Sequence, residues 1–179
     1  MKILGVAGSL RSESYAFKAL ELAMRKIEAL GCQSELLDLR KLNLPFCDGS
    51  AEYPNNPDVN LLREKFISAQ GIILSAPEYH GSVSGVLKNT LDLLDFQHVE
   101  GKVFAIISVL GGEYSTNALS AVRIVCRHLH AWVIPEQVVI PYSHTAFDVK
   151  GELVDPQLQR RLDTLIEQLV KYTKKLHHN

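Results

Sequence analysis

The sequence lacks the signature motifs of several common enzyme classes. It contains no G-x-x-x-x-G-K-[ST] segment, so no lysine is placed to reach a triphosphate, and the usual G-x-G-x-x-G dinucleotide-binding turn is also absent. The stretch 81–85 reads G-S-V-S-G and does not match the G-x-S-x-G turn of serine hydrolases. These absences argue against a P-loop enzyme, the usual dinucleotide-binding turn and a serine hydrolase.

Cysteine is scarce, and histidine forms no metal-binding pattern. Cys32, Cys47 and Cys126 are odd in number and have no C-x-x-C spacing, which predicts reduced thiols in a cytoplasmic protein. Four histidines lack the acidic or cysteine partners that a metal site needs: His128, His130, His177 and His178. We therefore predict no bound metal.

Long apolar runs and an excess of one charge are missing as well. No run approaches the ~18–20 apolar residues that cross a bilayer, and the first residues resemble no secretory signal. The sequence has 19 lysines and arginines and 20 aspartates and glutamates, which gives a formal net charge of -1. This balance argues against a nucleic-acid partner, and the absent apolar run argues against a membrane partner.

Apolar runs alternate with helical patterns along the 179 residues, a length that fits one domain. The expected strands are 2–7, 34–39, 72–76, 102–109 and 132–140. The expected helices are 17–30, 58–69, 84–96, 115–130 and 156–176, the first of them closed by Gly31. Five strand–helix units predict an α/β fold with a doubly wound parallel sheet in the order 2-1-3-4-5.

The segment from Gly5 to Ser14 links the first strand to the first helix. The first-turn amides of a helix have no partner within it, and the helix dipole adds positive charge, so this position suits an anion. Ser9, Ser12 and Ser14 offer hydroxyl groups, and Arg11 offers a guanidinium suited to phosphate oxygens. Two interpretations remain open, a phosphate-monoester site and a plain helix cap beside a surface arginine.

Two further loops follow strands that should end at the same edge of the sheet. The first is 75–82, in which Pro77 stiffens the chain and Gly81 frees it around Tyr79 and His80. The second is 108–115, in which Gly111 and Gly112 let main-chain amides approach a flat ligand. Ligands of such sheets bind beyond the carboxyl ends of the strands, so the three loops together predict a binding site.

These motifs resemble the NADPH-dependent FMN reductase family, whose members include azoreductases, quinone reductases and chromate reductases. The resemblance spans nearly the whole chain and is carried by G-S-L-R-S-E-S at 8–14, P-E-Y-H-G-S-V-S-G-V-L-K-N at 77–89 and the glycine pair at 111–112. The segment 38–46 is also similar to the one that follows the second strand in this family. The resemblance implies a flavodoxin-like three-layer sandwich, with residues 1–179 forming a single FMN-binding domain.

The resemblance also implies roles for individual residues. Ser9, Arg11 and Ser14 would hold the FMN phosphate. Five consecutive residues would border the ribityl chain and the ring system, largely through backbone: Pro77, Glu78, Tyr79, His80 and Gly81. Gly111 and Gly112 would face the pyrimidine end of the ring. The side chain of Glu78 is a candidate for a pair between subunits, and no side chain is assigned as catalytic because the flavin carries the redox chemistry.

The chain departs from the family pattern at two places. Asparagine is frequent in the family where His80 stands, so His80 is either a proton donor or a turn residue. Many members carry a second glycine pair where this chain has Glu113, Tyr114 and Ser115. This second difference changes the substrate side of the pocket.

The function implied is transfer of hydride from NADPH or NADH through FMN to a small acceptor. The candidate acceptors are a quinone, a free flavin, an azo compound and an oxyanion such as chromate. Family members are dimers or tetramers, so a homodimer or homotetramer is expected, with the helix after residue 84 as the contact surface. The alternatives are a flavodoxin-type electron carrier, which the near-neutral charge disfavours, and a non-catalytic regulator on the same fold.

Overall fold

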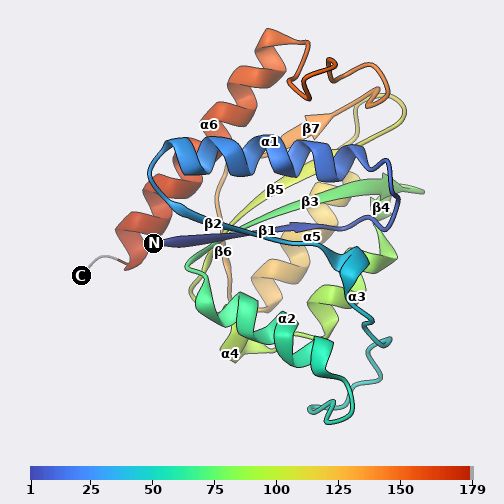
Figure 1. Cartoon of the computed structure of the whole chain (residues 1–179), viewed down its shortest axis with the longest axis vertical. Coiled ribbons are helices and arrows are strands. Elements are labelled where there is room, and N and C mark those ends of the chain that lie inside the picture. The colour runs from blue at the N-terminus through green and yellow to red at the C-terminus, as the bar shows by residue number, and fades with distance from the viewer. Residues whose placement is uncertain (178–179) are drawn as a thin grey trace.

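A parallel sheet lies between two layers of helices in the computed structural model, which describes residues 1–177 (Figure 1). The strands are β1 (Lys2–Ala7), β2 (Gln33–Leu37), β3 (Gly71–Tyr79), β4 (Ser82–Val83), β5 (Val103–Val109), β6 (Trp132–Val133) and β7 (Val138–Ile140). The helices are α1 (Tyr15–Ala29), η1 (Leu39–Lys41), α2 (Pro57–Ser68), α3 (Gly85–Asp92), α4 (Phe96–Val99), α5 (Asn117–His128) and α6 (Pro156–His177).

The strand order is β2-β1-β3-β5-β6, which confirms the predicted 2-1-3-4-5 order. Two details differ from the prediction. The fifth strand is broken: β6 pairs with the start of β5 and β7 with its end, because Pro135 lies between them and has no N–H for the ladder. The sheet is also not wholly parallel, since β4 pairs antiparallel with the end of β3.

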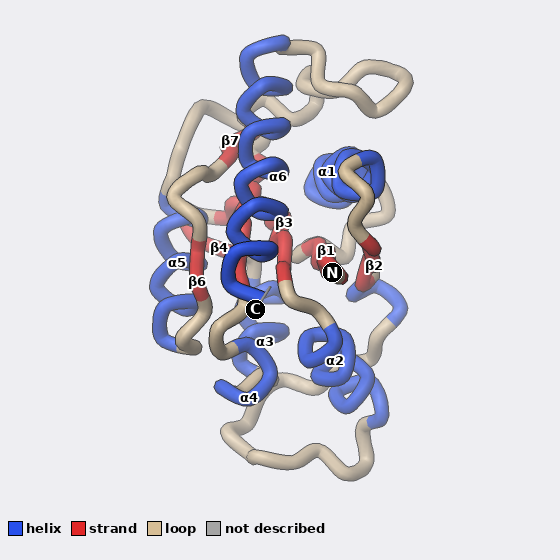
Figure 2. Tube along the Cα trace, turned by 90° about the vertical axis from the view of Figure 1, so that its left-hand side faces the viewer, coloured by secondary structure: helices blue, strands red, loops and turns tan. Residues whose placement is uncertain are grey.

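Each face of the sheet is covered by its own helices. Ile3, Ile73 and Ile107 pack into a core with α1 and α6, while alternate residues such as Leu4 and Ile72 pack toward α2, α3 and α5. Figure 2, turned by 90°, shows the two groups of helices on opposite sides of the strands. Burial on both faces explains why most residues of β1, β3 and β5 are apolar.

Side-chain caps fix where most helices begin. Ser14 caps α1 through Phe17 N, Asn56 caps α2 just before Pro57, and Ser84 caps α3 through Leu87 N. The helix predicted over 84–96 ends at Asp92, and a separate short helix, α4, begins at Phe96, where Asp95 forms a capping box. Among residues 1–177, no helix is both long and apolar enough to span a bilayer.

Candidate functional site

A cleft of about 520 Å³ opens at the carboxyl edge of the sheet. Most of its lining comes from the three segments singled out in the sequence: Ser9, Arg11, Glu13, Ser14, Tyr15, Ala16, Pro77, Glu78, Tyr79, Val109 and Gly111. Ser143 and His144, which follow β7, complete it and were missed. Applying the same strand-end rule to the fifth strand would have found this polar pair.

The segment between β1 and α1 presents unused hydrogen-bond donors to this cleft. Ser9 and Ser14 are buried, and their hydroxyl oxygens accept backbone N–H groups, from Arg11 at 3.4 Å and from Phe17 at 3.1 Å. Each hydroxyl therefore keeps its own proton for a ligand. Arg11 is exposed and has no ion pair within residues 1–177, and the first turn of α1 contains no acidic residue. The donors together suit a phosphate group.

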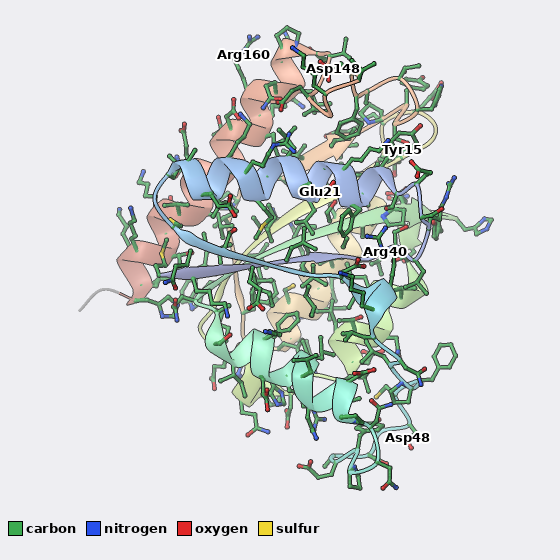
Figure 3. All side chains as sticks on the ribbon, viewed as in Figure 1. Tyr15, Glu21, Arg40, Asp48, Asp148 and Arg160 are labelled. Atoms are coloured by element: carbon green, nitrogen blue, oxygen red, sulfur yellow. The ribbon has the colours of Figure 1, made fainter. Side chains whose placement is uncertain are left out.

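Arg40 anchors this segment from η1, a role that sequence reasoning did not assign. Its guanidinium donates to the carbonyl of Ser12 at 3.3 Å, binds the Asp38 carboxylate at 2.8 Å and lies over the Phe17 ring. The hydrogen bonds from Arg40 hold the pKa of Asp38 below its usual value. Figure 3 places Arg40 and Tyr15 at the same end of the molecule. Arg40 is thus occupied by structural contacts, and Arg11 is the guanidinium left for a ligand.

Gly8 is required for packing. A Cβ at this position would lie 2.6 Å from Leu87 Cβ and 3.1 Å from Ser84 Oγ, distances that are too short for ordinary contact. Ser84 donates to the carbonyl of Gly8 at 2.6 Å while it caps α3. Gly8 therefore allows close packing of α3 against the end of β1.

β3 and β4 form a hairpin that projects beyond the sheet (Figure 1). Its two turn residues, His80 and Gly81, have φ values of 51° and 74°, as a type I′ turn requires. Asparagine tolerates positive φ especially well and histidine does so more often than most residues, which explains their exchange at this position. Both turn residues lie outside the cleft lining, whereas Pro77, Glu78 and Tyr79 lie within it.

Glu78 links the hairpin to α5. Its Oε2 atom accepts a hydrogen bond from Ala118 N at 2.9 Å, and Thr116, at the N-cap of α5, provides no side-chain cap. A carboxylate at this position also complements the helix dipole. One oxygen of the side chain is therefore engaged within the chain, and the pair between subunits stays a prediction.

The turn after β5 is open. No atom lies within 4 Å of a Cβ built on Gly111 or Gly112, so space remains on this side of the cleft. The turn is tied to the segment after β7 through two bonds, Tyr142 N to Gly112 O at 3.0 Å and Ser143 N to Leu110 O at 2.9 Å. Gly111 lines the cleft and Gly112 does not.

Several other polar residues are accounted for by structural contacts. Lys88 pairs with Asp92 within α3, and Asn89 binds the backbone of Pro45 and Cys47. Arg123 donates to the carbonyls of the segment 134–136. Burial raises the pKa of Cys126 to about 12, so its thiol is protonated.

Histidine and acidic side chains do not gather into a metal site. Within residues 1–177, no group of three His, Cys, Asp or Glu side chains could hold a metal ion. His128 and His130 instead lie beside the Phe96 ring. His178 lies outside the described residues.

Comparison with known proteins gives consistent matches. The sequence model of the NADPH-dependent FMN reductase family matches residues 1–145. The NADPH-dependent FMN reductase ArsH of Rhizobium meliloti (strain 1021) is 32% identical over 177 residues, covering 96% of this chain and 72% of that protein. The FMN-dependent NADPH-azoreductase of Staphylococcus aureus (strain USA300) is 30% identical over 178 residues, covering 96% and 95%.

Solved structures share the fold. FerB, an NAD(P)H:acceptor oxidoreductase from Paracoccus denitrificans, superposes with a TM-score of 0.83 at 19% identity, covering 97% of each chain. The apo form of the NADH:FMN oxidoreductase EMOB superposes with a TM-score of 0.76 at 22% identity, covering 94% of this chain and 89% of the other. These structures confirm the flavodoxin-like architecture.

The residues of the cleft fit FMN, which combines a phosphate dianion with a flat ring. The hydroxyls of Ser9 and Ser14, the guanidinium of Arg11 and the first-turn amides of α1 are donors without a competing carboxylate in the first helical turn. The open turn at Gly111 leaves room for a planar group. With this fit, and with a family match over most of its length, the chain belongs to the NADPH-dependent FMN reductase family and is an FMN-dependent NAD(P)H oxidoreductase.

Proposed function

We propose that the cleft binds FMN through its phosphate at Ser9, Arg11 and Ser14, and that the protein reduces a small planar acceptor. The ring would lie between the backbone of 77–79 and the amides of Gly111 and Gly112. In this assignment His80 and Gly81 form the turn that holds the backbone of 77–79 in place beside the ring. One observation carries the proposal: two buried hydroxyls with free protons and an unpaired guanidinium meet at one helix terminus inside the cleft.

Bound FMN supplies the chemistry, since its ring accepts a hydride and passes two electrons to an acceptor. The chain has to bind, orient and expose this ring. Amides at Gly111 and Gly112 would donate toward the ring edge where negative charge develops, and the hairpin would hold one face in place. The open side of the cleft would admit the donor and the acceptor in turn, so we expect ping-pong kinetics.

A planar acceptor is favoured by the walls of the cleft. Tyr79 lines it with 46% of its surface exposed, and the space at Gly111 is free of side chains. These features suit a quinone, a free flavin or an azo compound more than chromate, which carries no ring to stack. The azoreductase name of the Staphylococcus aureus relative supports the same choice.

The proposal also covers assembly and location. We place the protein in the cytoplasm as one FMN-binding domain, in a homodimer or homotetramer formed around α3. Beside that helix lies a mostly apolar groove of about 380 Å³, whose lining includes Leu10, Phe46 and Val86. Phe46 is 88% exposed in the single chain. Light scattering on the purified protein would give its mass in solution, and a monomer would contradict this part.

The proposal is tested by the absorption spectrum of the purified protein, reconstituted with FMN, and by anaerobic titration with NADPH and NADH. We expect flavin absorbance at the start, rapid bleaching with a nicotinamide nucleotide, and recovery when a quinone or an azo dye is added. Bound flavin that is not bleached would indicate an electron carrier. A protein that ignores added FMN would indicate a non-catalytic regulator, and recovery with chromate alone would contradict the planar acceptor.

A further inference from the structure

A second cavity of about 420 Å³ lies beside the cleft and is not used by the FMN assignment. It is lined by the end of β7, the segment after it, Tyr114 and the start of α6. Tyr142 and Thr145 border this cavity, while the two residues between them, Ser143 and His144, border the cleft. One short segment therefore separates the two spaces, and a ligand extended across it would reach both.

The lining of this cavity suits a flat aromatic group. Tyr114 and Tyr142 are 59% and 48% exposed, although large aromatic side chains are normally more buried. Val139, Pro141 and Leu158 add apolar surface beside them. Tyr142 also has a positive φ of 46°, a conformation that is uncommon for a bulky residue. Two such rings offer a stacking surface for a purine base.

Positive charge lies at one side of the same cavity. Arg161 lines it and also lines a shallow groove that continues along α6, where Arg160 is its neighbour. Neither guanidinium forms an ion pair or a side-chain hydrogen bond with any residue of the described part of the chain, 1–177. Figure 3 shows Arg160 at the exposed start of α6. Unpaired guanidinium groups are suited to phosphate oxygens.

Two carboxylates face the same spaces, Asp155 in the cavity and Glu136 in the groove. Asp155 accepts a hydrogen bond from Gln157 N at 2.8 Å, at the start of α6. Glu136 has one buried oxygen, Oε2, without a hydrogen-bond partner in the described residues. Carboxylates accept hydrogen bonds from hydroxyl and amino groups, so they suit the sugar or base of a nucleotide whose phosphate is held by the arginines.

We infer that this cavity binds the adenosine 2′-phosphate half of NADPH, with the adenine between Tyr114 and Tyr142 and the 2′-phosphate at Arg161 and Arg160. This inference rests on the proposed function, because it assumes that the nicotinamide enters the neighbouring cleft. On this inference, residues of α6 determine whether the protein prefers NADPH or NADH as the hydride donor. NADH shares the adenine and lacks the 2′-phosphate, so the tyrosines serve both nucleotides and the arginines serve NADPH alone.

The test uses the FMN-loaded protein and two probes without a nicotinamide, adenosine 2′,5′-bisphosphate and adenosine 5′-monophosphate, in calorimetric titrations. We expect the bisphosphate to bind more tightly to the unmodified protein. In the double variant Arg160→Gln/Arg161→Gln, its Kd and the KM for NADPH should rise by about 10- to 100-fold, while the KM for NADH stays unchanged. Tyr114→Ala should raise the KM for both nucleotides by a similar factor. Arg127→Gln, an exposed arginine on α5, serves as the control.

The outcomes separate this inference from the proposed function. If the double variant binds the bisphosphate as the unmodified protein does while NADPH still bleaches the flavin, the inference is wrong and the proposed function stands. An equal rise in the KM for NADPH and NADH in the double variant would also overturn it, because a loss of folding or of general charge would affect both. If neither nucleotide bleaches the flavin of the unmodified protein, the proposed function itself fails.

Discussion

The two edges of the sheet use their polar groups in opposite ways. At the amino edge, turn residues are bonded to one another: Lys102 Nζ donates to the carbonyls of Ile67 and Ala69, and Gln70 Oε1 accepts from Lys2 N at 2.8 Å. At the carboxyl edge, Arg11 has no ion pair among residues 1–177, and the hydroxyl protons of Ser9 and Ser14 have no acceptor there. The same fold thus has one edge that is closed by its own contacts and one that is open to a ligand.

The difference shows how a ligand site can be distinguished from a structural turn. Buried polar groups are almost always hydrogen-bonded, so donors left over near a cavity indicate a partner from outside the chain. Two cations make the contrast concrete. Lys102 lies at the C-terminus of α2, where a positive charge satisfies the last carbonyls, and Arg11 precedes the N-terminus of α1, where no partner is supplied.

The largest effect is expected at the open edge. Arg11→Met should raise the Kd for FMN by roughly 30- to 150-fold, because a charge-assisted bond to phosphate contributes about 2–3 kcal/mol. The free energy of unfolding of the apoprotein should stay within about 0.5 kcal/mol, since Arg11 makes no contact that the fold needs. Quenching of FMN fluorescence and urea unfolding measure the two quantities.

Arg127→Met is the matched control, because Arg127 is also exposed, lies in the last turn of α5 and does not line the cleft. An Arg11 variant that binds FMN as tightly as the Arg127 variant would remove the basis for assigning the phosphate to this loop.

The reciprocal effect is expected at the closed edge. Lys102→Met should lower the free energy of unfolding by about 1.5 kcal/mol, because carbonyls at the end of α2 lose a charged donor while much of the side-chain volume is kept. The Kd for FMN should not change, since the residue lies at the opposite end of β5. Urea unfolding of the apoprotein and FMN titration of the folded protein provide the comparison. A variant that lost FMN affinity without losing stability would contradict the division between the two edges.

Much of the fold was predictable because the signals were local. Alternating strands and helices, and apolar strands buried on both faces, fixed the order of the sheet. Breaks set by single residues were missed, namely Pro135 in the fifth strand and Asp95 between α3 and α4. Each break depends on one hydrogen bond gained or lost, which a periodic pattern over ten or more residues does not resolve.

The site was predictable where the chain itself presents donors, and not where a role depends on a distant neighbour. Ser9, Arg11 and Ser14 were found from their place between a strand and a helix. Gly8 packs against Leu87, Arg40 donates to Ser12, and Glu78 accepts from Ala118. The two members of each pair are 28 to 79 residues apart in the sequence. Such partners are set by the tertiary structure, so the local sequence did not reveal the packing at Gly8, the bond from Arg40 to Ser12 or the bond from Ala118 to Glu78.

The smallest effect is a pH dependence confined to the closed edge. His98 is 3% exposed, and its Nδ1 atom accepts a hydrogen bond from Asp95 N at 2.8 Å in the α4 capping box. Burial lowers the pKa of His98 below its ordinary value of 6.5, so the native state resists the proton that the unfolded chain accepts. The unfolded state therefore binds more protons as the pH falls below about 6.5, and the free energy of unfolding decreases in that range.

His98→Gln isolates this contribution, because a glutamine at the same position of a capping box still accepts from the N-cap amide but does not titrate. The loss of stability between about pH 7.5 and pH 5.5, measured by urea unfolding, should be smaller in the variant than in the unmodified protein. The FMN affinity of the two proteins should follow the same pH profile, since His98 lies on the edge remote from the phosphate loop. Equal losses of stability in both proteins would mean that the His98 ring takes up its proton without disturbing the α4 cap.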